Sequence, residues 1–215
     1  MAPGLLYAVT TIDSPLLEES TFDKWYDLHI AELAAVDGGP PVGYRYQNVD
    51  RVHQKWQFLA IYPLKDVAFT RTPDVSKNMT YVHPMLPEGK SILDLIKYDG
   101  RDYDFIGDES TAINTEEKPK WIITAEVDVG DNDGTAQKVD SVLNERVKGV
   151  QTSRYRINRA PAAVNGTDVP EYLVPRELAI YSTDQKEDID RAAKELEQKL
   201  QGVGASVELS TWTAK

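Results

Sequence analysis

The chain contains an internal repeat, and this repeat restricts the fold more than any other feature of the sequence. The tetrapeptide LAIY occurs at residues 59–62 and again at residues 178–181. An Arg-Tyr pair begins at Arg45 upstream of the first copy and at Arg154 upstream of the second. Both pairs lie in runs that alternate with the period of a β-strand. The repeat therefore predicts two halves of the same architecture.

The segments around the repeat support the same division. Apolar, β-favouring segments open the halves at residues 5–13 and 121–129, and a helix-like stretch follows each of them. After the second LAIY, residues 188–204 place apolar side chains at steps of three and four, which predicts an amphipathic helix. Residues 205–212 alternate again and predict a closing strand.

The first half ends in a longer version of the same order. Pro87 opens PEGKSILDLIK, which predicts a helix, and residues 98–106 predict the closing strand. The order βαββαβ thus occurs twice, which predicts an α+β fold of two ferredoxin-like repeats packed sheet to sheet as an intramolecular barrel. We assign the first repeat to 1–107, a linker to 108–118 and the second repeat to 119–215. Whether the halves are independent domains stays open here.

Composition restricts partners and compartment. With 215 residues, 41% of them hydrophobic, the chain is long enough to bury a substantial core. A net charge of −11 and a pI near 4.8 disfavour nucleic acid and anionic membranes as partners. The sequence shows no apolar run of membrane-spanning length and no signal-peptide pattern at its start, which predicts a cytoplasmic protein. The absence of cysteine excludes disulfides, thiolate nucleophiles and cysteine-based metal sites.

A histidine lies on the apolar face of the first predicted helix. In STFDKWYDLHIAEL, Phe22, Trp25, His29 and Leu33 fall at steps of three and four. His29 is therefore expected to point toward the sheet with large apolar side chains. It is either a general acid or base in an apolar cavity or a buried histidine bonded to a backbone carbonyl or a tyrosine.

The same helix resembles the opening helix of dimeric α+β barrel proteins, especially their EthD-like branch. The matching pattern is a Phe, a Trp-Tyr pair and a His three residues later. The matching residues are Phe22, Trp25, Tyr26 and His29. Two positions depart from the pattern, because Leu28 stands where many members have Glu and Ala31 where many have Pro.

That resemblance implies two ferredoxin-like units that form one barrel, with pockets between each sheet and its helices. Activities in such proteins include cofactor-free oxygenation, lactone isomerisation, decarboxylation, cyclisation, haem chemistry and stress-response roles without catalysis. A fold of this kind does not fix the reaction.

All histidines lie in the first half, which predicts that the working pocket is there. His53 is expected in an exposed hairpin, and His83 in a segment that either covers the pocket as a lid or forms an ordinary surface loop. Several tyrosines are expected to border the cavity and to bind an aromatic ligand, although tyrosine also commonly just covers a sheet. They are Tyr26, Tyr44, Tyr46, Tyr62, Tyr98 and Tyr103.

Other kinds of site have little support. No helical metal-ligand spacing, phosphate-binding glycine loop or nucleophile elbow occurs, so we expect no metal and no cofactor. Haem would need an axial ligand, for which His29 or His83 could serve in principle. Arg45 and Arg154 recur beside the repeated tyrosine, which indicates a shared structural ion pair on the outer face rather than a role in the site.

The sequence thus predicts a cofactor-independent lyase or isomerase that acts on an aromatic or polyketide-like oxygenated substrate. His29, Tyr46 and Tyr62 are the predicted catalytic residues. The predicted ligand-binding residues are Phe22, Trp25, Tyr26, Tyr44, His83, Tyr98 and Tyr103. A cofactor-free oxygenase of a phenol and a non-catalytic ligand-binding or stress-associated protein are the alternatives. A small apolar or aromatic ligand is the expected partner, and pairing of whole chains into a homodimer stays open.

Overall fold

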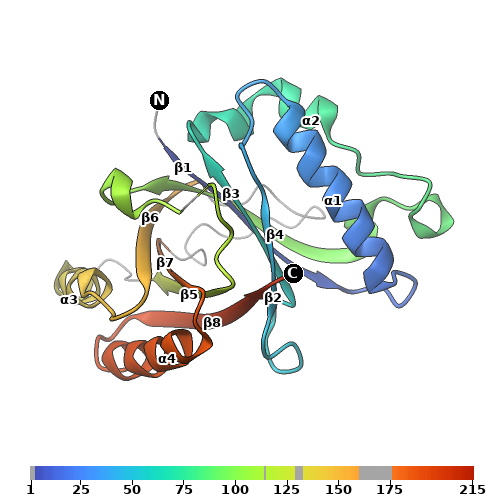
Figure 1. Ribbon diagram of the computed structural model, residues 1–215. Coiled ribbons are helices and arrows are strands. Elements are labelled where there is room, and N and C mark those ends of the chain that lie inside the picture. The colour runs from blue at the N-terminus through green and yellow to red at the C-terminus, as the bar shows by residue number, and fades with distance from the viewer. Residues whose placement is uncertain (1–2, 114, 129–132, 160–175) are drawn as a thin grey trace.

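The strands of the computed structural model form a closed barrel. The structure describes residues 3–113, 115–128, 133–159 and 176–215. In these residues the barrel order is β1-β3-β2-β8-β5-β7-β6-β4, and every neighbouring pair is antiparallel (Figure 1). The strands are β1 (Gly4–Ile12), β2 (Tyr44–Asn48), β3 (Phe58–Leu64), β4 (Ile96–Phe105), β5 (Trp121–Asp128), β6 (Gln151–Arg159), β7 (Glu177–Thr183) and β8 (Ser206–Ala214).

The two halves of the barrel have the same strand order. The first runs β4-β1-β3-β2 and the second β8-β5-β7-β6, and the pairs β2–β8 and β4–β6 join them. The two LAIY segments lie in the equivalent strands β3 and β7. In both, the alanine lies opposite another alanine, Ala60 opposite Ala8 and Ala179 opposite Ala125. These findings confirm the predicted α+β barrel.

Helices cover the barrel from outside on both halves. Figure 1 shows α1 and α2 over one side of the barrel and α3 and α4 over another. None of the helices in the described part of the chain is long and apolar enough to cross a bilayer. The helices are α1 (Glu19–Ala35), α2 (Pro73–Asn78), α3 (Asp133–Asn144) and α4 (Lys186–Leu200).

Alternation along the strands separates an interior core from two outer cores. In β3, Leu59 and Ile61 belong to the core inside the barrel, whereas Ala60 and Tyr62 face the helices. The helix α1 adds Phe22 to the first outer core. Since successive side chains of a strand point to opposite faces, both faces of this sheet are buried.

The amphipathic helix predicted after the second LAIY is present as α4. Its buried side chains include Ile189, Leu196 and Leu200, at the predicted three- and four-residue spacing. Acidic residues occupy its first turn and Lys199 its last, which matches the helix dipole. Full burial of each leucine stabilises the fold by roughly 2 kcal/mol relative to exposure.

The predicted helix that starts at Pro87 is wrong. The chain instead forms two 3₁₀ turns, at Pro87–Gly89 and Ile92–Asp94. Glu88 has a φ of 55°, which no α-helix accommodates, and Ser91 forms a capping box with Asp94 that closes a single turn. This 3₁₀ turn still buries the apolar side chains of the segment, since Ile92 is completely buried.

The segment between the halves contains a short 3₁₀ turn at Glu109–Thr111. Ser153 of β6 donates a hydrogen bond to the carbonyl of Thr111, and Gln151 donates to the carbonyl of Ala112. This part of the predicted linker therefore lies against the second half. Residues 160–175, where Pro, Gly and Asn predict a long hairpin loop, lie outside the described residues.

The repeated arginines have the predicted structural role. Arg45 in β2 pairs with Asp23 of α1 at 2.6 Å, and Arg154 in β6 pairs with Asp140 of α3 at 2.8 Å. In each half, the second strand is thus tied to the helix that precedes it. The shared ion pair on the outer face is confirmed.

Candidate functional site

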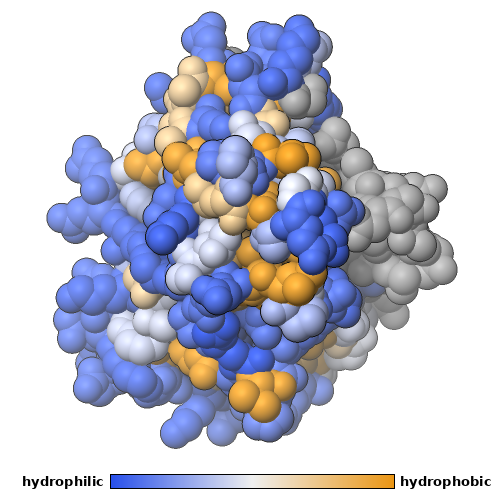
Figure 2. Space-filling view, turned by 90° about the vertical axis from the view of Figure 1, so that its right-hand side faces the viewer, coloured by the Kyte–Doolittle hydropathy of each residue, from blue (hydrophilic) through white to orange (hydrophobic). Residues whose placement is uncertain are grey.

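A cavity of about 310 Å³ lies between α1 and the outer face of the first half-sheet. Strands β1, β3 and β4 form its floor, and α1 forms one wall. The opposite wall comes from α2 and from the segment that follows it, through Val75, Met79 and Tyr81. Figure 2 shows the face that carries α1 and α2, where apolar side chains are scattered among hydrophilic ones.

The depth of the cavity comes from small residues in the sheet. Ala8 and Gly100, which both line the cavity, lie opposite each other on β1 and β4, where larger side chains would fill the space. A Cβ atom on Gly100 would collide with the hydroxyl of Tyr98. The absence of a side chain at this position therefore lets the Tyr98 ring lie across the strand.

His29 reaches the cavity from α1 and is held between aromatic rings. Its imidazole stacks on Trp25, with centroids 4.8 Å apart, and meets Tyr26 edge-on at 5.7 Å. The indole N–H of Trp25 donates to the carbonyl of Thr80 at 3.0 Å. The N–H of Thr80 donates to the Glu32 carboxylate at 2.9 Å. The imidazole orientation is therefore fixed from both the helix and the opposite wall.

Burial keeps the imidazole uncharged. The Nδ1 atom of His29 is buried and has no hydrogen-bond partner. Burial lowers the pKa of His29 from 6.5 to about 4, an effect that the nearby Glu32 carboxylate partly opposes. The alternative of a histidine whose ring is satisfied by a backbone carbonyl or a tyrosine does not hold for Nδ1. At neutral pH this ring is a proton acceptor.

Three buried polar atoms without partners meet in this cavity. They are the Nδ1 of His29, the hydroxyl of Tyr62 and the Oγ1 of Thr10, and all three residues line it. The Tyr62 hydroxyl interacts with that of Tyr26, but without the geometry of a normal hydrogen bond. Leaving a buried polar group unpaired costs about 1–3 kcal/mol. Three such groups around one apolar hollow are therefore expected where a polar ligand supplies the missing hydrogen bonds.

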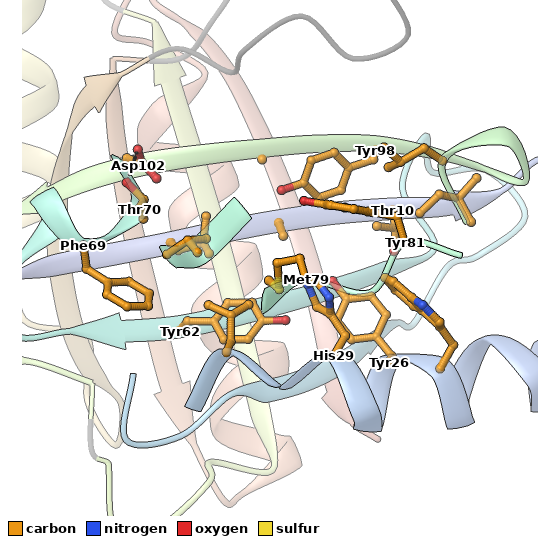
Figure 3. A pocket seen from close by; sticks show the side chains of 18 residues that line it. Thr10, Tyr26, His29, Tyr62, Phe69, Thr70, Met79, Tyr81, Tyr98 and Asp102 are labelled. Carbon is orange, nitrogen blue, oxygen red and sulfur yellow. Dashed lines mark hydrogen bonds between the residues drawn. The ribbon is translucent and has the colours of Figure 1, made fainter. Parts of the chain in front are cut away.

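The tyrosines around His29 stay protonated. Burial raises the pKa of Tyr26 to about 12. Burial also raises the pKa values of Tyr62 and Tyr98, and in both cases the neighbouring Tyr26 adds to the rise. In Figure 3, Tyr26 and Tyr62 lie beside His29, and Tyr98 lies across the cavity from them. These hydroxyls are hydrogen-bond donors for an oxygen atom of a ligand.

The far end of the cavity carries a carboxylate. The Thr70 hydroxyl donates to Asp102 at 2.8 Å, and both residues line the cavity (Figure 3). No lysine or arginine belongs to its described lining. The described lining therefore offers no cation to the carboxylates of a haem. Within the described residues, no cluster of His, Asp or Glu could hold a metal ion.

The structure brings five of the predicted site residues together. His29, Trp25, Tyr26, Tyr62 and Tyr98 all line the cavity. His83 does not, and its Nδ1 accepts a hydrogen bond from the N–H of Met85. Phe22 packs beside Trp25 in the outer core without lining the cavity.

The predicted placement of three tyrosines is wrong. Tyr44, Tyr46 and Tyr103 belong to the core inside the barrel. In the antiparallel pairing, Tyr44 lies opposite Ile61 and Tyr46 opposite Leu59. Directly opposed residues share a face of the sheet, so these rings point away from the cavity.

Several cavity residues were not anticipated from the sequence. Thr10 and Asp102 lie on strands, on the cavity face, and strand alternation could have identified them once that face was known. Thr70 comes from a 3₁₀ helix at Val67–Arg71 and Tyr81 from an irregular segment, and neither carries such a signal. The two departures from the family pattern, Leu28 and Ala31, are exposed on α1 and remove nothing from the cavity.

Comparisons with known proteins find the fold but no sequence family. No family model matches the chain, and no curated protein matches it. A provisionally named monooxygenase from Fusobacterium nucleatum has 11% identity and a TM-score of 0.55, covering 99% of this chain and 92% of its own. A chlorite dismutase variant from Candidatus Nitrospira defluvii has 13% identity and a TM-score of 0.52, covering 99% and 91%. The chain thus shares the chlorite dismutase-like α+β barrel fold.

Proposed function

We propose that this protein is a cofactor-independent small-molecule enzyme that transfers protons within an oxygenated, aromatic or polyketide-like substrate. The observation that carries the proposal is the convergence of three unpartnered polar atoms in one apolar cavity. His29 is the base, and Tyr62 donates a hydrogen bond to the substrate oxygen. The similarity to proteins named as chlorite dismutase and monooxygenase supports an enzyme of small molecules.

The proposed step moves one proton and no electrons leave the substrate. The imidazole of His29 takes a proton from a carbon beside a carbonyl group, and the C–H electron pair forms the enolate. The enolate oxygen accepts a hydrogen bond from Tyr62 while the imidazolium beside it balances its charge. Return of the proton to another carbon completes an isomerisation, and its transfer to a departing hydroxyl group completes the loss of water.

A base of low pKa can carry out this step when hydrogen-bond donors stabilise the developing negative charge on the substrate oxygen. Burial holds the pKa of His29 at about 4. Ketosteroid isomerase uses an aspartate base with a pKa of about 4.6, assisted by buried hydrogen-bond donors to the developing oxyanion. A C–H bond between two carbonyls, as polyketides contain, is more acidic and needs less assistance.

Oxygenation of a phenol is less well supported by this cavity. It requires an anion that persists until it meets dioxygen, and no lysine or arginine lines the described cavity to stabilise one. A transient enolate paired with the His29 imidazolium avoids this requirement. Non-catalytic binding is also less well supported, because His29 retains an unpaired ring nitrogen.

The proposal is tested by exchange of substrate protons in heavy water. The protein is incubated with cyclic and aromatic 1,3-dicarbonyl compounds, and deuterium uptake is followed by NMR. We expect His29→Ala to slow exchange by about 100-fold or more, as for loss of a general base. Tyr62→Phe should slow it by about 100-fold, as for loss of one oxyanion donor.

Tyr46→Phe is the matched control. This tyrosine is as buried as Tyr62 but faces the barrel interior, so its loss should leave exchange unchanged. Running the same reactions under air and under nitrogen separates proton transfer from oxygenation. Exchange that persists in His29→Ala would refute the proposal, and ligand retention without exchange in either protein would favour the binding-protein alternative.

A further inference from the structure

His29 lies between two side chains of α1 that both carry a hydrogen-bonding group. Trp25 precedes it by four residues and Glu32 follows it by three, so the three side chains share a face of the helix. The Trp25 ring stacks on the imidazole, with centroids 4.8 Å apart. The Glu32 side chain is partly exposed and does not line the cavity. It therefore acts on a ligand only through its neighbours.

Trp25 and Glu32 both bind the same residue on the opposite side of the cavity, Thr80. The indole N–H of Trp25 donates to the Thr80 carbonyl at 3.0 Å, and the Thr80 N–H donates to the Glu32 carboxylate at 2.9 Å. The residues on either side, Met79 and Tyr81, line the cavity (Figure 3). We call residues 79–81 the Thr80 wall, and α1 holds this wall through both backbone polar groups of its middle residue.

The Thr80 wall has no helix or strand of its own, so its position depends on what it is bound to. At its far end, the N–H of Ile92 donates to the Tyr81 carbonyl at 2.8 Å. Val82 then pairs with Ser91 in an isolated β-bridge. Loss of the Glu32 carboxylate would therefore loosen the wall from α1 while leaving it attached to the 3₁₀ turn.

Glu32 also supplies the charge that acts on His29. Burial lowers the pKa of the imidazole, and the Glu32 carboxylate partly opposes this effect. The guanidinium of Arg45 lies outside the cavity lining, over the Tyr26 ring, and is bound to Asp23 at 2.6 Å. Asp102 accepts from Thr70 at the far end of the cavity. The titratable groups that line the cavity with His29 are Tyr26 of α1, Tyr62 of β3, Tyr98 and Asp102 of β4, and Tyr81 of the Thr80 wall.

The tyrosines around His29 are uncharged at neutral pH. Burial raises the pKa of each of them, Tyr26, Tyr62, Tyr81 and Tyr98. They can donate hydrogen bonds to a ligand, but they cannot balance a positive charge that forms on the imidazole. Glu32 can do so from outside the cavity, because a carboxylate close to a cation favours the charged form.

We propose that Glu32 is a positioning residue with two separable roles: its carboxylate holds the Thr80 wall against α1, and its charge stabilises the imidazolium form of His29. The inference rests on the proposed function, since this imidazolium is the species that forms when the ring takes a proton from the substrate. Glu32 contributes without touching the substrate, so its side chain leaves the volume of the cavity unchanged.

NMR titration of the imidazole tests the role of the charge. Glu32→Gln keeps an oxygen that accepts from the Thr80 N–H but removes the negative charge. The chain has only three histidines, so His53→Gln and His83→Gln variants assign the His29 signal. We expect the pKa of His29 to be lower in Glu32→Gln than in the native protein, because the opposing effect of the carboxylate is lost. A ring that stays uncharged at pH values where the native ring begins to titrate is the same result.

Hydrogen exchange of the Thr80 amide tests the role of the wall. Glu32→Ala removes the acceptor, and we expect this amide to exchange about tenfold or more faster than in the native protein. In Glu32→Gln it should stay protected. Glu32→Asp serves as a second variant if Glu32→Ala does not fold, since its shorter side chain withdraws the acceptor from Thr80 but keeps the charge.

Glu197→Gln is the matched control. This residue is exposed on α4, in the other half of the barrel, and the substitution changes the net charge equally. It should alter neither the pKa of His29 nor the protection of the Thr80 amide. An unchanged or raised pKa of His29 in Glu32→Gln would overturn the proposal. So would a Thr80 amide that stays fully protected in the variant that lacks the acceptor.

Deuterium uptake by the substrate connects both roles to turnover. We expect Glu32→Gln to slow uptake by about threefold or more, because a less basic imidazole removes the proton less readily. Uptake that proceeds at the native rate in this variant would overturn the role of the charge in the reaction. Failure of the proposed function is distinguishable, since it would abolish uptake in the native protein, whereas the two NMR measurements report on Glu32 without any substrate.

Discussion

Burial of His29 couples folding to pH. Its pKa is about 4 in the folded protein and 6.5 when the ring is exposed, so between these values the unfolded chain binds more protons. The contribution of the uncharged His29 ring to the free energy of unfolding is therefore fully present above pH 6.5 and is lost as pH falls toward 4. Between pH 7 and pH 5 the loss attributable to this group is at most about 2 kcal/mol.

Replacement of the imidazole should remove this dependence. We expect His29→Gln to lose less stability than the native protein when urea unfolding is compared at pH 7 and pH 5. The loss of unfolding free energy between pH 7 and pH 5 should differ between the two proteins by up to about 2 kcal/mol. An identical loss in both would mean that the ring is protonated as readily in the folded protein as in the unfolded chain.

The sequence predicts the direction of a side chain better on the helix than on the strands. His29 shares a helical face with Phe22 and Trp25, so its direction follows from spacing alone. The strand tyrosines differ, because alternation separates Tyr62 from its neighbours but does not say which face meets the helix. Only the register, which places Tyr46 opposite Leu59, assigns Tyr46 to the barrel interior.

The strand β4 shapes the cavity through Gly100. An added methyl group there would collide with the Tyr98 hydroxyl, so the ring, which lines the cavity, would have to shift. We therefore expect Gly100→Ala to weaken binding of a probe, an aromatic 1,3-dicarbonyl compound as used in the exchange assay, by about tenfold or more, which corresponds to about 1.4 kcal/mol. Calorimetry on the variant measures this directly.

A second glycine provides the control for that substitution. A Cβ atom on Gly202 would meet nothing within 4 Å, so Gly202→Ala should change neither binding nor, beyond about 0.5 kcal/mol, stability. Unaltered probe affinity in Gly100→Ala would show that Tyr98 moves without closing the cavity. The small residues Ala8 and Gly100 would then not determine the depth of the cavity.

Among the elements, regular periodicity was predictable and single turns were not. The helix α4 follows from a continuous apolar stripe that ends in Leu196 and Leu200. The segment after Pro87 carries the same spacing for only one turn, and there the left-handed Glu88 determines the outcome. Local capping and backbone conformation override a short pattern, because a few apolar contacts are satisfied equally well by a 3₁₀ turn.

The whole molecule is held together across its two halves. The core inside the barrel draws on both, with Tyr7 and Leu59 from the first and Leu178 and Trp212 from the second. Arg101 of β4 forms a buried ion pair with Glu126 of β5, and the hydroxyl of Tyr7 donates to the same carboxylate at 2.6 Å. Separating the halves would expose this core and leave the Glu126 carboxylate without the Arg101 guanidinium.

We therefore propose that residues 1–107 and 119–215 are not independent domains, although the repeat in the sequence permits that reading. Produced alone, each half should fail to give a folded monomer, because one face of its sheet would lack a partner. Mixed together, the halves should form a one-to-one complex, detectable by light scattering and circular dichroism. The native chain cleaved within 108–118 should stay assembled, since β2–β8 and β4–β6 close the barrel without that segment. A single half that unfolds cooperatively as a monomer would instead show that closure of the barrel only joins two stable units.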